Sequence, residues 1–327
     1  MCDDHHGVTG DQSADTSRLL ATSPSNWGRW GETDEVGSLN FLTSAEVMRG
    51  VRSVRQGKVF TCGEVIGSAS GDPLWPGRIH AKRETVIDKA SYVRGDLSSL
   101  PGGAEFADDK IEMFLQGSTQ FDALGHVWYD DMLWNGYPAT DTNGGMKKAS
   151  ILPIAERGVV GRGVLLDMAR FKGKEYLEKG DLLGLDDILG CAEGQGVTIE
   201  RHDILCLRLG FLQLLHIQGP DVFYRDFLEP GLTYSPALVD WFHRMEIPCL
   251  STDTISNETE LDPRVGVQIP LHCALMRNLG IAFNEICNFE RLAEDCHADG
   301  QWDFLYAAAP LKVAEATGAP TNVLAIK

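Results

Sequence analysis

Short apolar runs bounded by glycine recur along the chain, and they limit the folds open to it. Each run has the length of a strand, and most are continuous rather than alternating, which is typical of strands buried on both faces of a sheet. The predicted strands are 58–66, 110–115, 163–168, 203–209, 248–252, 280–286 and 323–326. With 327 residues, 43% of them hydrophobic, the chain can build one large core.

Helix signals are fewer than strand signals. Thr43 and Glu46 form a capping box that predicts a helix through about Arg55. Ser235 followed by Pro236 predicts the start of another. Further helices are predicted at 185–194, at 269–279 with Gly280 as C-cap, and at 289–296. The pattern indicates a mixed α/β protein, with a flexible N-terminal arm at 1–25 and a single domain at 26–327.

Composition excludes several functional classes. The formal charge of −18 opposes binding to nucleic acid or to an anionic membrane. The apolar runs are far shorter than the roughly 20 residues of a membrane span, and neither a dinucleotide nor a P-loop glycine motif is present. The eight cysteines include no Cys-x-x-Cys pair, and the polar, acidic N-terminus lacks the features of a secretory signal. We therefore expect a cytoplasmic protein without a membrane or nucleic-acid partner.

The segment from Gln116 to His126 is the most unusual in the chain. Gln116, Gln120, Asp122 and His126 follow one another at intervals of four, two and four, among small residues that let a ligand approach the backbone. We expect a loop here that follows the strand at 110–115 and binds a metal. Spacing alone leaves a second interpretation open, a turn whose polar side chains cap their own backbone.

Two downstream residues strengthen the metal interpretation. His272 lies on the predicted helix 269–279, and Glu285 lies in the apolar strand 280–286. A glutamate inside such a strand is costly to bury unless a cation or hydrogen bonds meet it. The alternative is an edge strand that exposes Asn284 and Glu285 to water.

The segment 116–126 resembles the signature of the metal-dependent cyclase family, His-x-Gly-Thr-His-x-Asp-x-Pro-x-His, which includes kynurenine formamidases and isatin hydrolases. Thr119, Asp122 and His126 match the Thr, the Asp and the last His, while His272 and Glu285 resemble the family's downstream ligands. Further similarity lies at 26–31, 37–43, 207–210 and 250–253. The resemblance implies a swivelling β/β/α fold, a mixed sheet flanked by helices, and a homodimer or homotetramer.

Gln116 and Gln120 stand where the signature has two metal-binding histidines, so the chain represents a branch that departs from it. An amide oxygen is a harder and weaker ligand than imidazole, which favours Mn²⁺, with Mg²⁺ or Zn²⁺ as alternatives. The expected ligands are Asp122, His272 and Glu285, followed by Gln120 and then Gln116. Both glutamines remain alternative candidates for orienting the substrate.

The resemblance implies hydrolysis of an amide, imide or lactone bond of a small substrate by water that a divalent cation activates. His126 is the expected general base and then general acid, because an imidazole exchanges protons near neutral pH. Trp128, Asp253 and Ser256 are candidates for binding the substrate, although core packing or a turn would also explain them. Two other functions stay open: a lyase or cyclase that uses the same metal, and a metal-free binding protein.

Overall fold

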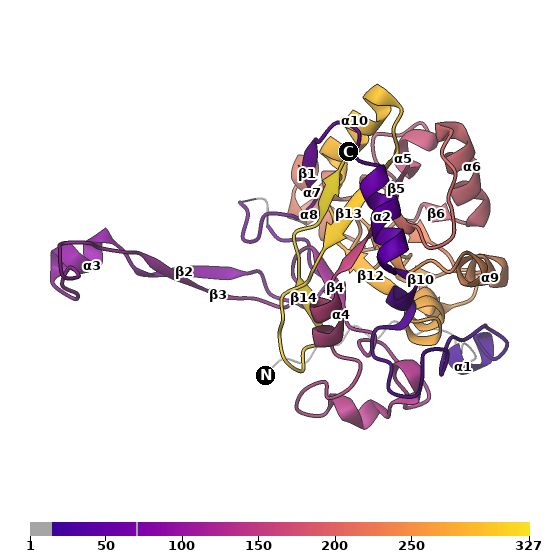
Figure 1. The fold of residues 1–327 in the computed structure, drawn as a ribbon, viewed down its shortest axis with the longest axis horizontal. Helices are drawn as coiled ribbons and strands as arrows, with labels where there is room; N and C mark the ends of the chain where they lie inside the picture. The colour runs from indigo at the N-terminus through magenta and orange to yellow at the C-terminus, as the bar shows by residue number, and fades with distance from the viewer. Residues whose placement is uncertain (1–14, 70) are drawn as a thin grey trace.

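The computed structural model describes residues 15–69 and 71–327. A nine-stranded mixed sheet forms its centre (Figure 1). In spatial order its strands are β1 (Val59–Thr61), β15 (Leu324–Ile326), β13 (Asp303–Ala308), β5 (Val159–Asp167), β7 (Ile204–Arg208), β9 (Cys249–Thr252), β12 (Ala282–Glu285), β4 (Gln120–Asp122) and β14 (Gly318–Pro320). Strands β5, β7, β9 and β12 are parallel to one another, and the outer strands pair antiparallel.

The parallel strands explain the continuous apolar runs of the sequence. Every residue of β7, β9 and β12 is buried, as expected for strands covered on both faces. The predicted strands at 163–168, 203–209, 248–252 and 280–286 are thereby confirmed, although β5 begins earlier, at Val159. The fold class is also confirmed, since the mixed sheet is flanked by helices.

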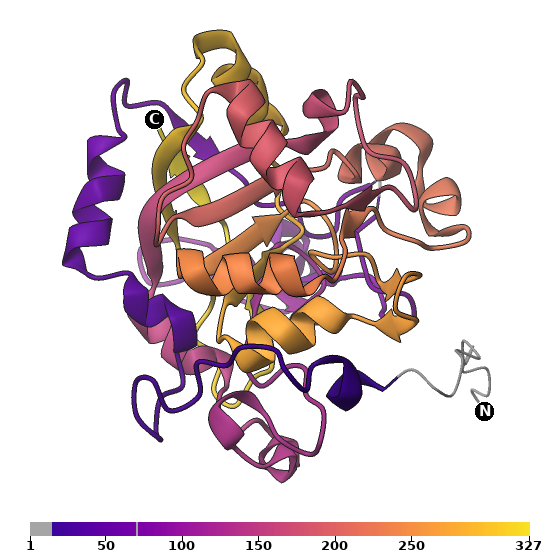
Figure 2. The same ribbon diagram turned by 90° about the vertical axis from the view of Figure 1, so that its right-hand side faces the viewer.

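Helices pack on the sheet and on one another. Helix α2 (Ser44–Arg52) begins at the capping box of Thr43 and Glu46 and lies across β5 and β13 (Figure 1). A Cβ atom on Gly50 would lie 2.5 Å from the carbonyl oxygen of Gly161, so glycine is required where this helix crosses the strand. Helix α9 (Pro236–Met245) and the π-helix η4 (His272–Asn278) run side by side (Figure 2).

The remaining elements connect or cover the sheet. Among them, α6 (Leu185–Gln195) and α10 (Glu290–Asp299) confirm the helices predicted at 185–194 and 289–296. Helices are α1 (Thr16–Leu19), α4 (Ile151–Arg157), α5 (Met168–Phe171), α6 (Leu185–Gln195), α7 (Leu212–Gln218), α8 (Pro220–Tyr224), α10 (Glu290–Asp299) and the 3₁₀ turns η1 (Gly37–Phe41), η2 (Trp134–Gly136) and η3 (Ala139–Thr142). Two short ladders pair β6 (Leu182–Leu183) with β8 (Gly231–Leu232), and β10 (Leu261–Asp262) with β11 (Val267–Gln268).

A long hairpin projects from the body of the molecule (Figure 1). It consists of β2 (Lys82–Ile87), α3 (Lys89–Arg94) and β3 (Asp108–Glu112), and β3 is exposed along its whole length. The strand predicted at 110–115 is present but shifted to 108–112, and it is exposed instead of buried because its charged residues face water. The hairpin and its base expose large apolar side chains, namely Ile79, Val86, Val93, Leu97, Leu100, Phe106, Ile111 and Phe114.

The predicted N-terminal arm falls partly outside the described residues, which begin at residue 15. From there to residue 25 the chain lies against the body. Leu20 belongs to the hydrophobic core, and Ser17 Oγ donates to Asp130 Oδ2 at 2.7 Å. Within the described part of the chain, no helix is long and apolar enough to cross a membrane.

Candidate metal centre

Strand β4 brings the unusual segment 116–126 into the sheet. It lies between β12 and β14, and Gln120 pairs directly with Glu285. Since side chains alternate along a strand and paired residues share a face, Gln120, Asp122 and Glu285 project from the same face. All three are buried, so the expected ligand-bearing loop is in fact a strand at this point, and the alternative of an exposed edge strand for Glu285 is wrong.

His272 reaches these carboxylates from the first residue of η4. The predicted α-helix at 269–279 is a π-helix over the residues that carry the site, a rare form that often occurs at functional sites. His272 Nε2 lies 3.4 Å from Glu285 Oε1 and 4.0 Å from Asp122 Oδ2. Imidazole and two carboxylates from different elements therefore meet at one point.

Glu258, which the sequence did not single out, holds His272 in this orientation. Its Oε1 lies 2.6 Å from His272 Nδ1 and accepts from the backbone N–H of His272 at 2.6 Å. Its Oε2 accepts from the backbone N–H of Leu271 at 2.7 Å. A buried carboxylate on Nδ1 leaves Nε2 free to face the other two side chains, which is the usual support for a metal-binding histidine.

The atoms of Asp122, His272 and Glu285 fit a cation. One ligand atom from each side chain lies within 4.8 Å of the others, and this is the only such group of three or more His, Cys, Asp or Glu side chains in residues 15–69 and 71–327. Burial and the neighbouring Asp122 charge raise the pKa of Glu285 to about 7. Burial alone would lower the pKa of His272, but its contacts with Glu258 and Glu285 raise it to about 10. The two carboxylates thus favour positive charge at this point, which a divalent cation would supply when bound.

The two glutamines of the segment occupy different positions. Gln120 Nε2 donates to Glu285 Oε2 at 2.7 Å, while its Oε1 is buried and has no hydrogen-bond partner in the described chain. Gln116 Nε2 donates to Thr317 Oγ1 at 2.9 Å, on the other side of β4 from β12. Asp122 Oδ1 is likewise buried without a partner among the described residues. Oxygens of this kind are costly to bury, so Gln120 and Asp122 have acceptor capacity left for a ligand.

A small cavity opens onto the cluster. We call it the metal cavity; its volume is about 90 Å³, and its lining includes Asp122, His272 and Glu285 together with His126 and Ser256. His126 Nε2 lies 3.9 Å from Asp122 Oδ2. Burial lowers the pKa of His126, against the opposing effect of the Asp122 charge, so the imidazole is ready to accept a proton. Trp75, Arg78, Val127, Ile255 and Ile269 complete the wall, and the sequence did not single out any of them.

The three residues expected to bind substrate lie in different places. Ser256 lines the metal cavity, and its hydroxyl contacts Glu229 Oε2 at 2.7 Å. Asp253 does not line it: both oxygens accept backbone N–H groups, from Leu209 and Gly210. Trp128 is 42% exposed and is also outside the lining.

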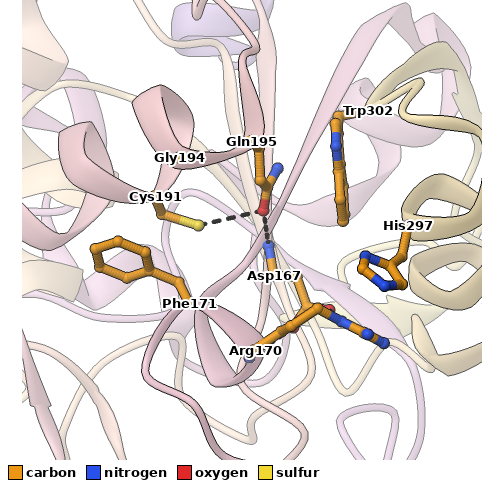
Figure 3. Close-up of a pocket in the computed structure, with 8 residues that line it drawn as sticks. All are labelled: Asp167, Arg170, Phe171, Cys191, Gly194, Gln195, His297 and Trp302. Atoms are coloured by element: carbon orange, nitrogen blue, oxygen red, sulfur yellow. Dashed lines mark hydrogen bonds and ion pairs between the residues drawn. The ribbon is translucent and has the colours of Figure 1, made fainter.

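Another cavity, of about 320 Å³, lies beside α5 and α6 (Figure 3). Its polar groups largely satisfy one another. Gln195 Oε1 accepts from the backbone N–H of Asp167 and from Cys191 Sγ, and Asp167 also pairs with Arg170. The cavity is therefore less suited to a reactive ligand than the metal cavity.

Comparison with known proteins decides the family. A family model described as "Putative cyclase" matches residues 45–259. The chain belongs to the cyclase family. A crystal structure described as that of a novel cyclase is 34% identical to it, with a TM-score of 0.84, and the match covers 93% of this chain and 98% of that one. The search of curated proteins finds no match.

More distant cyclase-family similarity extends to isatin hydrolases. Isatin hydrolase A from Labrenzia aggregata, bound to benzyl benzoate, is 19% identical, with a TM-score of 0.58 and coverage of 88% of this chain and 98% of that one. An isatin hydrolase bound to the product analogue thioisatinate is 17% identical, with a TM-score of 0.57 and coverage of 88% and 97%. At these identities the likeness concerns the fold.

Proposed function

We propose that this member of the cyclase family is a metal-dependent hydrolase that opens an amide, imide or lactone bond of a small cyclic or aromatic substrate. The observation that carries the proposal is the buried cluster of Asp122, His272 and Glu285 at the wall of a cavity that also contains His126. A bound divalent cation would polarise the carbonyl group and lower the pKa of water. The fold shared with isatin hydrolases is consistent with this chemistry.

The protein's side chains divide the work of holding the cation. Asp122 and Glu285 contribute negative charge, and His272 contributes Nε2 because Glu258 occupies Nδ1. Gln120 steadies Glu285 through Nε2 and has a free Oε1 as a further ligand, whereas Gln116 is the last candidate. Because most of these donors are oxygens, Mn²⁺ is the proposed cation, ahead of Mg²⁺ and Zn²⁺.

His126 is the proposed proton carrier. Its Nε2 lies in the same cavity as the cluster, and its lowered pKa keeps it neutral at pH 7. It takes a proton from the attacking water and delivers it to the nitrogen or oxygen that leaves when the C–N or C–O bond breaks. Ser256, which lines the cavity, is the proposed hydrogen-bonding partner of the substrate.

The test is hydrolysis of cyclic amides, imides and lactones by the purified chain before and after exhaustive chelation. We expect activity to disappear with the metal and to return with Mn²⁺ better than with Zn²⁺. Activity that survives when elemental analysis finds no metal would refute the mechanism. Reactions in ¹⁸O water provide the control for chemistry, since a lyase or cyclase product would not incorporate the label.

Two features bear on where and how the enzyme works. Each cysteine of the described chain is a buried free thiol, which supports a reducing compartment such as the cytoplasm. The apolar side chains exposed on the projecting hairpin support a homodimer or homotetramer, because an isolated two-stranded hairpin is marginally stable in water.

A further inference from the structure

A second cavity lies next to the metal cavity and shares part of its wall. We call it the aromatic cavity; its volume is about 370 Å³, and it is lined by Leu74, Trp75, Pro76, Gly77, Arg78, His80, Tyr224 and Phe227. Trp75 and Arg78 also line the metal cavity. The two cavities therefore lie side by side, with Trp75 and Arg78 at their common wall.

The sizes of the two cavities imply that they hold different parts of the substrate. A water molecule takes about 30 Å³ of liquid volume, so a metal cavity of about 90 Å³ holds the reacting group and little else. The rest of the substrate needs another place. The aromatic cavity is about four times as large and shares Trp75 and Arg78 with the metal cavity.

The walls of the aromatic cavity suit a planar ring. Trp75 and Phe227 meet edge to face with centroids 6.2 Å apart, and the rings of Tyr224 and Phe227 stack at the same distance. The Tyr224 hydroxyl already forms two hydrogen bonds with the backbone: it donates to Asp72 O at 3.0 Å and accepts from Leu74 N at 2.8 Å. The cavity thus offers apolar aromatic surface.

The loop that carries Trp75 and Arg78 is held in place before any ligand arrives. Asp72 is buried, and its two carboxylate oxygens accept the backbone N–H groups of Gly67 and Ala81. Arg78 N also donates to Trp75 O at 3.1 Å, which closes a turn. Preorganisation of this kind lowers the cost of ordering the site on binding.

Arg78 carries a positive charge at the wall of both cavities, where its charge acts on Glu285 without a close ion pair in the described chain. Its Nη1 donates to the carbonyl oxygen of Gln116 at 2.9 Å, and no carboxylate among residues 15–69 and 71–327 forms an ion pair with it. Arg162 and Arg208, by contrast, each pair with two carboxylates. A divalent cation would balance the charges of Asp122 and Glu285, so the half-buried Arg78 guanidinium would have hydrogen-bonding capacity for an anion.

We propose that the substrate is an aromatic compound with a separate anionic group, whose ring enters the aromatic cavity and whose anionic group binds Arg78 at the shared wall. This inference rests on the proposed hydrolase function, since it places the carbonyl to be cleaved in the metal cavity. Arg78 and Trp75 then determine specificity. A guanidinium binds carboxylate or phosphate in a fork of two hydrogen bonds, which a neutral amide cannot reproduce.

Binding of three small probes to the full chain tests the inference without any turnover. The probes are 3-phenylpropionate, the neutral 3-phenylpropanamide and the non-aromatic butyrate, each titrated calorimetrically into Mn²⁺-loaded and into chelated protein. We expect 3-phenylpropionate to bind at least about tenfold more tightly than either of the others, because a hydrogen bond to a charged group contributes about 1.5–3 kcal/mol. Equal affinities for the charged and the neutral aromatic probe would overturn the proposal, and this comparison requires no variant.

Variants assign the preference to residues. Arg78→Gln should remove the preference for 3-phenylpropionate over its amide. Trp75→Ala should lower the affinity for both aromatic probes. Arg83→Gln is the matched control, because it removes the same charge from an exposed pair with Asp109 on the hairpin. A charge preference that survives Arg78→Gln but disappears on chelation would mean that the carboxylate binds the metal, and would refute the role of Arg78. A chain that binds through Arg78 yet hydrolyses nothing would refute the hydrolase and leave this inference standing.

Discussion

Replacement of Glu258 by glutamine tests two roles of this side chain, the support of the metal-binding His272 and the stabilisation of the fold. The carboxylate faces three N–H groups, the backbone amides of Leu271 and His272 and the His272 Nδ1 group, at 2.6 to 2.7 Å. Glutamine has the same shape but only one oxygen, and its NH₂ group would face a donor. At least one of the three groups therefore loses its acceptor, and His272 loses the charged partner that orients its ring.

The expected size of the effect follows from these contacts. Loss of a carboxylate that supports a metal-binding histidine typically weakens metal affinity by about 10–100-fold, which corresponds to about 1.4–2.7 kcal/mol. A buried N–H group without an acceptor costs a further ~1–3 kcal/mol of folding stability. We expect Glu258→Gln to show both losses, in the dissociation constant of Mn²⁺ and in the unfolding free energy of the chelated protein.

Calorimetric titration of Mn²⁺ and urea unfolding of chelated protein provide the two readouts. Glu260→Gln is the control: it makes the same change two residues away, at a side chain that contacts only Gln268 among described hydrogen-bond partners. This control should bind Mn²⁺ as the wild type does. If Glu258→Gln binds Mn²⁺ with wild-type affinity while its stability falls, Glu258 only caps the start of η4 and the proposed support of His272 is wrong.

Three further outcomes are expected. Asp122→Asn should lose metal content and activity together, whereas His126→Ala should keep the metal and lose about 10²–10⁴-fold in kcat. His126→Gln should not restore kcat. A metal-loaded, active His126→Ala protein would show that another residue is the base. Burial raises the pKa of Glu229 from 4.5 to about 8, so the folded chain keeps a proton that the unfolded chain releases above about pH 4.5. Wild-type stability should therefore fall as pH rises from about 5 to 8, by roughly 1.4 kcal/mol per unit of pKa difference at most, and urea unfolding of Glu229→Gln at both pH values should show a smaller fall; identical slopes would contradict this. Light scattering should give the mass of a homodimer or homotetramer, and a monomer would remove that proposal.

The parts of the fold that sequence predicts well are those where local pattern and burial agree. The central strands are continuous apolar runs, and Thr43 and Glu46 mark the start of α2 by a local capping rule. Residue types suggested Asp122, His272 and Glu285 as one ligand set, and the resemblance then favoured that interpretation. Spacing alone left a turn open for the segment of Asp122 and an exposed edge strand open for Glu285.

The parts that sequence missed depend on contacts between distant segments. Strand β4 consists of Phe121 between the polar residues Gln120 and Asp122, and it is a strand because β12 and β14 pair with it on both sides. Glu258 lies 14 residues before His272 in a segment with no periodic pattern, so nothing local connects the two. Arg78 and Trp75 belong to an irregular loop, and only the folded chain brings that loop to the metal cavity.

The projecting hairpin leaves and rejoins the body at neighbouring points, because Arg78 Nη1 donates to the carbonyl oxygen of Gln116. Because the two ends of the hairpin lie close together, the hairpin lengthens the chain without moving the segments before and after it apart. Closing such a gap with a short Gly/Ser turn in place of residues 82–112 changes the loop-closure entropy only slightly. The hairpin is therefore a natural graft point: a fluorescent reporter or a binding module could replace it, and its excision would show whether assembly and chemistry are separable properties of this chain.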